Sequence, residues 1–325
     1  MDSLQEQHIQ NHLLELRDKL NETINLSKSY THLLDLKQQV EEALDKIENG
    51  TFGICELCKE EIEDDYLQTD PLVKICFSHL NEEQQRVIEK DLELAYQIQN
   101  NLLPEIRSDF PNFEISCHYE PLGPLSGDFY DVIKTQDGLF FLFGDVSGKG
   151  VSAALLMSNL NAIFRTLVAA NLPLKNLIET ANRLFSNSTL PSHYATLVCG
   201  RISSSGKAEI SNAGHCLPLI IRNKKVTAIE STGLPVGIHY SANYDVKNFQ
   251  LEAGDKLFLY TDGLTETRNS EGTEYGVQKL SNLLTEAGHL PTKELINRVL
   301  EDNKTFRAGQ QRTDDMTVMA FHRKL

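Results

Sequence analysis

The chain has 325 residues, of which 40% are hydrophobic, and a formal net charge of -15, values that allow a sizeable globular core in one large domain or two. Residues 1–103 hold 22 acidic and 9 basic residues, so most of the acidity lies there and direct binding of nucleic acid through this region is disfavoured. The polar N-terminus, with no apolar run near the roughly 18 residues of a membrane helix, predicts a cytoplasmic protein without membrane contact.

Residues 1–48 are predicted to be helical. There is no Gly or Pro between residues 4 and 48, and apolar residues recur at spacings of three and four. The polar segment Asn25 to His32 separates two sets of apolar positions. This pattern fits an antiparallel helical hairpin and a single long helix that pairs with a second copy equally well.

Residues 49–80 contain a predicted zinc site. Two Cys-x-x-Cys/His pairs are separated by 17 residues, so that each pair can offer two ligands to one tetrahedral ion. A segment this short and polar has little core without a metal. The predicted ligands are Cys55, Cys58, Cys76 and His79.

The segment from Ala43 to Cys55, with Pro71 and Cys76 after it, resembles the DksA/TraR-type zinc fingers. The resemblance implies one structural Zn²⁺, although the family's usual final Cys is replaced here by His79. Members of that family act on RNA polymerase through a helical hairpin. The resemblance therefore makes RNA polymerase a conceivable partner.

Residues 81–103 are predicted to form a linker helix. Asn81 is a suitable N-cap with Gln84 three residues later, and Pro104 ends the pattern. Apolar residues form one face of this helix, at positions 88, 92, 95 and 102, with Leu94 and Ile98 beside them. The face can be the seam of a homodimer or can pack on the chain's own C-terminal domain, and we favour the dimer.

Residues 104–325 are predicted to form an α+β domain. Short apolar or alternating runs bounded by Gly, Pro, Asp and Asn predict antiparallel strands at residues 195–202, 208–212, 217–222, 225–229, 256–260 and 316–322. Helical patterns cover residues 151–170, 174–187, 276–287 and 292–303. This order fits an antiparallel β-sandwich with helices outside the paired sheets.

Acidic residues in this domain lie at the ends of predicted strands. Asp145 ends the apolar run that begins at Phe140, where it can bind a hard cation or cap the following helix. A phosphate-binding P-loop is excluded, because Phe143 and Gly150 occupy the positions that need Gly and Ser or Thr. If the strands are neighbours, their ends bring together enough carboxylates for two divalent cations about 4 Å apart. The other acids in this context are Asp128, Asp262, Asp314 and Asp315.

The motifs SGDFYD, GDVSGKG, NAGH, YTDGLTE and DDMTV stand in the order found in the metal-dependent PPM-type serine/threonine phosphatases of the bacterial RsbU and SpoIIE group. This resemblance covers about residues 90 to 325 and implies the PPM phosphatase fold with two Mn²⁺ or Mg²⁺ ions. The ligands that it implies are the carboxylates of Asp128, Asp145, Asp262 and Asp314 and the carbonyl of Val146, with Asp315 as the second member of the Asp314–Asp315 pair.

The same resemblance implies attack of a two-metal-activated water on a phosphoserine or phosphothreonine protein, typically a STAS-type anti-anti-sigma factor. Two features depart from the eukaryotic relatives: Ser147 stands where they have a His, and no counterpart of their phosphate-binding Arg is found. We expect His215 of the NAGH motif to be structural rather than a general acid. We expect Lys149 to be a solvated loop residue.

These observations predict a protein serine/threonine phosphatase regulated through an N-terminal zinc module. A protein that binds the transcription machinery, with the phosphatase domain as a sensor or scaffold, is the alternative. A two-metal nuclease is disfavoured because the chain lacks a basic face for nucleic acid.

Overall fold

The computed structural model describes residues 7–324, except 8, 12, 15, 19, 22–30, 81, 107–109 and 190–192. The chain divides into two compact units, Met1–Glu93 and Leu94–Leu325. Apolar side chains form one core cluster within the first unit and three within the second. Each unit therefore has its own core.

In the first unit, the described residues between 7 and 21 are helical and pack on helix α2 (Thr31–Glu48). Ile9 and Leu13 are buried in the same cluster as Val40 and Leu44 of α2. This packing within one chain favours the hairpin over the self-pairing helix. The polar segment that would form the turn falls mostly outside the described residues.

The rest of the first unit is short helices and loops around the cysteines, followed by the start of a long helix. These helices are α3 (Asp64–Thr69), the 3₁₀ helix η1 (Phe77–His79) and α4 (Glu82–Leu102). Helix α4 begins and ends within two residues of the predicted linker helix. It continues into the second unit, which begins at Leu94.

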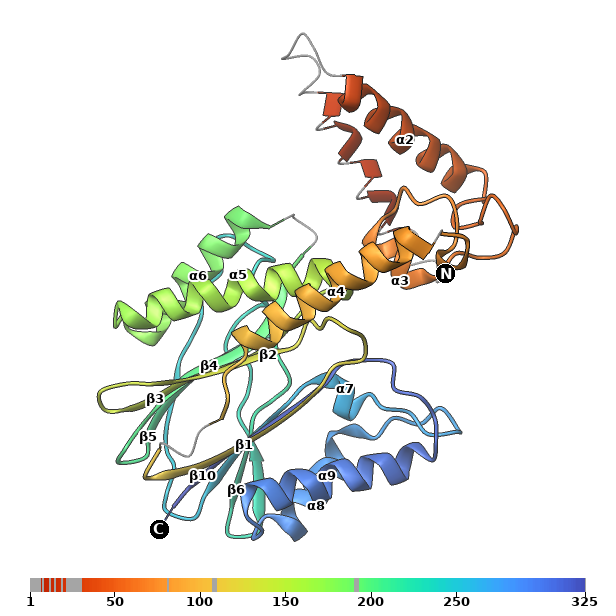
Figure 1. Cartoon of the computed structure of the whole chain (residues 1–325). Coiled ribbons are helices and arrows are strands. Elements are labelled where there is room, and N and C mark those ends of the chain that lie inside the picture. Colours follow the sequence, from red (N-terminus) through yellow and green to blue (C-terminus); the bar gives the residue numbers. More distant parts are fainter. Residues whose placement is uncertain are drawn as a thin grey trace. The chain divides into compact units, whose positions relative to one another are not determined.

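The second unit contains two five-stranded antiparallel sheets, so the predicted β-sandwich is confirmed (Figure 1). One sheet has the order β1 (Phe113–Glu120), β10 (Met316–Arg323), β9 (Lys256–Tyr260), β6 (Leu219–Arg222) and β7 (Lys225–Ala228). The other has the order β2 (Phe129–Lys134), β3 (Gly138–Val146), β4 (Ala195–Ser203), β5 (Lys207–Ala213) and β8 (Lys247–Gln250).

Helices cover the outer face of both sheets (Figure 1). Helices α5 (Gly150–Ala169) and α6 (Leu174–Ser188) pack on the β2-β3-β4-β5-β8 sheet, and α8 (Gly276–Ala287) and α9 (Thr292–Arg307) pack on the other. The sequence pattern did not predict the short helix α7 (Asp262–Thr265) or strand β8, and α9 runs four residues past its predicted end. Four residues carry too little periodicity to be recognised.

Strand β3 has both faces covered, which explains its continuous apolar run. Phe140 and Leu142 lie in the cluster beneath α5 and α6, whereas Phe141 and Phe143 lie in the cluster between the two sheets. Successive side chains of a strand point to opposite faces, so every position before Asp145 meets a core. Asp145, the next-to-last residue of β3, is half-buried and follows this buried run.

Helix α5 corrects one sequence-based expectation, because among the described residues it is the one helix long and apolar enough to cross a membrane. No such run was expected. One side of the helix packs on the domain, where Met157, Leu160 and Phe164 are buried, whereas Leu155 is 66% exposed. Its composition therefore follows from its position against the sheet.

Candidate metal centre

The two sheets deliver acidic residues to the same edge of the sandwich. Phe129 pairs with Gly144 in the antiparallel β2–β3 ladder, which places Asp128 beside Asp145. In the other sheet, Tyr260 pairs with Val318, so the end of β9 lies beside the start of β10. Asp262 follows the first of these strands, and Asp314 and Asp315 precede the second.

Hydrogen bonds between the sheets hold Asp128. The hydroxyls of Thr261 and Thr317 donate to its Oδ2 at 3.0 and 2.5 Å, and the residue is only 1% exposed. Sequence reasoning missed both threonines. Thr261 directly precedes Asp262 in the sequence, but its contact with Asp128 depends on how the sheets stack.

Gly127 brings the backbone close to the acids. A Cβ at this position would lie 2.8 Å from both Asp145 Oδ1 and the Val146 carbonyl oxygen. Those two oxygens therefore face the same point of the chain, and any side chain at residue 127 would push them aside. The Gly127 N–H also donates to Asp315 Oδ2 at 3.1 Å.

The neighbours Asp314 and Asp315 have different surroundings. Both carboxylate oxygens of Asp315 accept backbone hydrogen bonds, Oδ1 from Leu122 at 2.6 Å and Oδ2 from Gly127. The side chain of Asp314 is 44% exposed. Asp315 thus shapes the loop around the site, whereas Asp314 is open to a ligand.

Lys149 is exposed in the loop before α5, as expected, and it also contacts the acidic cluster. Its Nζ lies 3.5 Å from Asp314 Oδ1 and donates to the Thr313 carbonyl at 2.6 Å. The two glycines beside it, Gly148 and Gly150, have φ values of 96° and 67°, a left-handed backbone that favours glycine. The turn therefore places a positive charge next to the acids.

The carboxylates raise one another's pKa. Burial, followed by the charges of Asp262 and Asp314, raises the pKa of Asp145 to about 8. Burial and then Asp145 raise the pKa of Asp128, and burial and then Asp314 raise that of Asp262. Holding several buried carboxylates ionised in one cluster costs free energy of folding unless cations neutralise their charge.

The donor set suits hard divalent cations, because it consists of carboxylate and backbone carbonyl oxygens at the same edge of the sandwich. The alternative explanation of Asp145 as a helix cap fails. Asp145 lies within β3, and the N-cap of α5 is Lys149. Ser147 anchors the intervening loop, donating its N–H to the Tyr194 carbonyl and accepting from the Tyr194 N–H through Oγ.

His215 is buried in the turn after β5. Its Nδ1 lies 2.8 Å from Thr196 Oγ1, and its N–H donates to Asn212 Oδ1 at 2.8 Å. Burial lowers the pKa of His215 to about 4, against a smaller opposing contribution of the Tyr260 backbone. The hydrogen bonds hold the turn together, and burial keeps the imidazole neutral.

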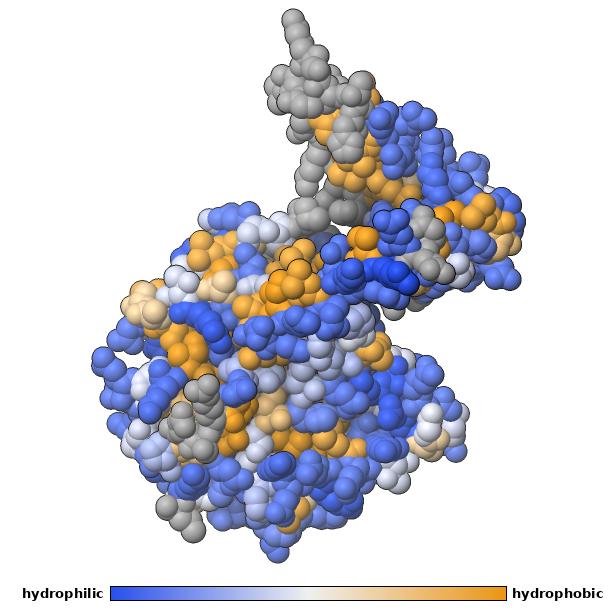
Figure 2. Space-filling view, viewed as in Figure 1, coloured by the Kyte–Doolittle hydropathy of each residue, from blue (hydrophilic) through white to orange (hydrophobic). Residues whose placement is uncertain are grey.

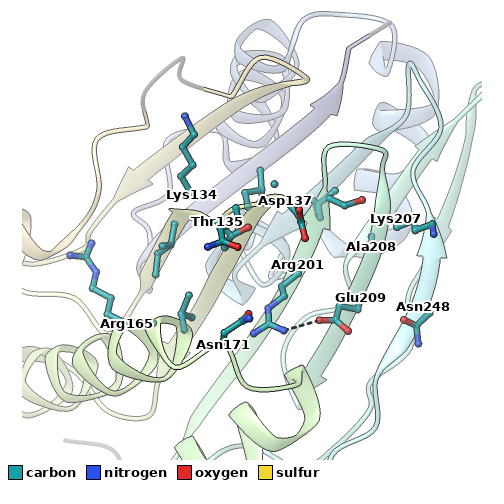
Figure 3. A pocket seen from close by; sticks show the side chains of 18 residues that line it. Lys134, Thr135, Asp137, Arg165, Asn171, Arg201, Lys207, Ala208, Glu209 and Asn248 are labelled. Atoms are coloured by element: carbon teal, nitrogen blue, oxygen red, sulfur yellow. Dashed lines mark hydrogen bonds and ion pairs between the residues drawn. The ribbon is translucent and has the colours of Figure 1, made fainter.

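A hollow of about 700 Å³ lies at the other end of β3, around Gly138 and the last turn of α5 (Figure 3). Its arginines are already paired, Arg165 with Asp131 and Arg201 with Glu209. Seven residues of extended strand, about 23 Å, separate Gly138 from Asp145. This hollow is therefore separate from the acidic cluster.

In the first unit, the four predicted zinc ligands lie together. One donor atom from each of the four residues lies within 4.8 Å of the others. Removal from water raises the pKa of the Cys55 thiol, but N–H groups of Cys58, Cys76 and Leu57 bring it to about 6, which favours the thiolate. Thiolate and imidazole donors at this spacing suit Zn²⁺. The four residues are Cys55, Cys58, Cys76 and His79.

Comparison with known families matches residues 135–324 to the family described as stage II sporulation protein E (SpoIIE), more than half of the chain. Protein IcfG of Synechocystis sp. is 28% identical over 263 residues, which are 72% of this chain and 41% of that protein. The phosphoserine phosphatase RsbU of Bacillus subtilis is 26% identical over 246 residues, 74% of this chain and 72% of RsbU.

Among solved structures, the SiaA-PP2C domain of Pseudomonas aeruginosa has a similar fold. The TM-score is 0.67 at 18% identity, and the match covers 74% of this chain and 98% of that domain. This similarity supports the fold of the second unit.

Proposed function

Because the chain belongs to the SpoIIE family, with a PPM-type serine/threonine phosphatase domain, we propose that it hydrolyses phosphoserine or phosphothreonine in a protein substrate. The observation that carries this proposal is the convergence of Asp128, Asp145 and Asp262 from two sheets, with pKa values raised by one another. IcfG is more than twice as long as the matched region, so the activity of the whole chain is part of the proposal.

We assign two Mn²⁺ or Mg²⁺ ions to this edge, with ligands from Asp128, Asp145, Asp262, Asp314 and the Val146 carbonyl. When bound, such ions activate water for attack on phosphorus and offset the charge of the phosphoryl oxygens. The chain's own contribution is to orient the ligands. Asp315 has both oxygens on backbone N–H groups, so we assign it to loop positioning before direct ligation.

Lys149 and Asp128 have separate roles in this scheme. Hydrogen bonds from two threonine hydroxyls hold Asp128 in one orientation. Lys149, half exposed beside Asp314, offers a positive charge at the rim where a substrate phosphate would approach. It can partly replace the arginine for which the sequence offers no counterpart.

For the substrate, we propose a phosphorylated STAS-type anti-anti-sigma protein, by analogy with the group that the motifs resemble. RsbU is named as a phosphoserine phosphatase, which supports a phosphoprotein substrate of this kind. Phosphoprotein enrichment from cells that lack the enzyme would identify the substrate directly.

We further propose that the first unit binds one structural Zn²⁺ and regulates the phosphatase. The support is the cluster of three cysteines and one histidine, together with the similarity to DksA/TraR-type fingers. The same similarity supports RNA polymerase as an alternative partner. Capture of RNA polymerase by the purified full-length chain, without Mn²⁺-dependent phosphatase activity, would favour that alternative.

The core proposal is tested with a phosphoserine peptide and Mn²⁺. We expect hydrolysis by the unmodified chain and loss of at least 10²-fold in kcat for Asp145→Ala combined with Asp262→Ala. Asp137→Ala is the matched control, because Asp137 lies near the opposite end of β3 and is exposed. Activity that persists in the double variant would contradict the assignment of Asp145 and Asp262 as metal ligands.

A further inference from the structure

Gln99 is a buried polar residue on a helix that is otherwise mostly exposed. It is 4% exposed, whereas its neighbours Ile98 and Asn100 are both exposed. Burying a carboxamide is costly unless its donor and acceptor find partners. The position of Gln99 therefore needs an explanation in its hydrogen bonds.

The carboxamide of Gln99 binds the backbone of Ser126 twice. Gln99 Nε2 donates to the Ser126 carbonyl at 2.8 Å, and the Ser126 N–H donates to Gln99 Oε1 at 3.1 Å. The pairing resembles one rung of an antiparallel ladder, with a side chain in place of a strand. It fixes both the distance and the rotation of the Ser126 peptide relative to α4.

The segment held in this way carries groups of the metal centre. The Asp128 N–H donates to Ser126 Oγ at 3.0 Å, and the Gly127 N–H donates to Asp315 Oδ2 at 3.1 Å. A continuous series of hydrogen bonds thus connects α4 to the acidic residues through Ser126, Gly127 and Asp128. Only Gly127 separates Ser126 from Asp128 in the sequence.

The end of α4 has a second point of attachment in the same unit. Arg165 of α5 donates from Nε to Asp131 Oδ2 at 2.6 Å. Its Nη2 donates to the Leu102 carbonyl at 3.4 Å. The Asp131 side chain is 2% exposed and lies in β2, three residues after Asp128. Both attachments therefore connect α4 to the strand that begins at the metal centre.

We propose that Gln99 is a positioning residue for the metal centre, whose carboxamide sets the place of the Asp128 carboxylate relative to α4. This proposal rests on the proposed function, because it assumes that Asp128 binds the catalytic ions. Its consequence is that loss of the Gln99–Ser126 pairing lowers cation affinity without removing any ligand.

The test compares Gln99→Leu with Asn100→Leu in the full-length chain. Leucine keeps the size of the buried side chain and removes both hydrogen bonds, whereas Asn100 is exposed and serves as the control. Free Mn²⁺, followed by electron paramagnetic resonance, should show at least tenfold weaker binding by Gln99→Leu, a size typical of residues that orient metal ligands, and unchanged binding by Asn100→Leu. Saturating Mn²⁺ should restore kcat, with KM for the phosphopeptide unchanged.

A second measurement locates the effect. In the metal-free protein, backbone hydrogens of residues 124–130 should exchange faster in Gln99→Leu than in Asn100→Leu. If Gln99→Leu does not fold, Gln99→Glu keeps the acceptor for the Ser126 N–H, loses the donor and should also weaken Mn²⁺ binding.

Mn²⁺ affinity equal to that of the unmodified chain, in whichever of these variants folds, would overturn the proposal. If the unmodified chain itself binds no Mn²⁺, or Asp145→Ala binds it equally well, the proposed function fails instead. The two failures can be told apart, because the first is seen only in the Gln99 variants, whereas the second is seen in the unmodified chain or in Asp145→Ala.

Discussion

At the scale of single residues, Asp128 shows what a buried carboxylate needs. Burial and the charge of Asp145 raise its pKa, while the hydroxyls of Thr261 and Thr317 favour the ionised form. The hydroxyls can offset only part of the cost of desolvation. A bound cation would supply the remaining compensation, so we expect the site to be most stable when cations occupy it.

His215 gives a prediction for the pH dependence of stability. Its pKa is about 4 in the folded chain and 6.5 ordinarily, so the unfolded chain binds the extra proton first as the pH falls. The contribution of neutral His215 is therefore complete above pH 6.5 and is lost progressively between about pH 6.5 and 4, on the order of 3 kcal/mol in total. Denaturant unfolding of the unmodified chain and of His215→Gln, at pH 7 and pH 5, measures this difference.

The glutamine variant should lose less stability on acidification than the unmodified chain, because its amide does not titrate. His289→Gln is the matched control, since His289 is exposed. An equal loss in all three proteins would show that His215 is not held neutral by burial.

Among the site residues, those at the ends of apolar runs could be predicted and those between the sheets could not. Asp145 follows a run of four residues that reads as a buried strand, so its place was visible in the sequence. Thr317 and Gln99 act through contacts between segments far apart in the chain. No local pattern reports such contacts, because they depend on register and on stacking of the layers.

At the scale of elements, helix α4 leaves apolar side chains without cover in the single chain. Leu94 and Ile98 are 56% and 54% exposed, and Val87 is similarly exposed on the same helix. Figure 2 shows hydrophobic surface along the visible side of this helix. Apolar residues at helical spacing on an exposed helix are typical of a helix that pairs with another, so the homodimer stays a prediction.

The dimer is tested by replacing Leu94 and Ile98 with Glu. If α4 is the seam, two like charges facing their copies should shift the chain from dimer to monomer, raising the dissociation constant at least a hundredfold. Sedimentation velocity across a concentration series measures this. Leu234→Glu is the control, because Leu234 is 54% exposed outside α4. A monomeric unmodified chain, or an unaffected double variant, would contradict the seam.

Elements with long periodic patterns were predictable, and short ones were not. Helix α8 and strand β9 have the predicted bounds, since each has a clear apolar pattern between Gly, Pro or charged residues. Strand β8 has only four residues and both of its ends are polar. Its place at the edge of the sheet comes from pairing with β5, a tertiary contact.

At the scale of the whole molecule, the chain combines two units with different sources of stability. The core of the second unit contains clusters on both faces of each sheet. The first unit has one small cluster, which includes Cys55 and Cys76. We therefore expect the first unit to depend on a bound metal for folding, whereas the large sandwich does not.

This difference predicts two separate thermal transitions, each sensitive to one metal. Removing Zn²⁺ with a selective chelator, or introducing Cys55→Ser, should abolish or lower the first transition, because thiolate ligation contributes directly to folding. Adding Mn²⁺ at a hundredfold excess over its dissociation constant should stabilise the second unit by about 2.7 kcal/mol and raise the second transition by roughly 5 to 10 °C. Differential scanning calorimetry resolves both.

The two substitutions serve as controls for each other. Asp145→Ala should remove the response to Mn²⁺ and leave the first transition unchanged, and Cys55→Ser should do the reverse. A single transition that moves with either metal would show that the units unfold together, in which case the zinc site would stabilise the phosphatase domain itself. Two independent transitions would mean that each unit is stabilised by its own core and its own metal site.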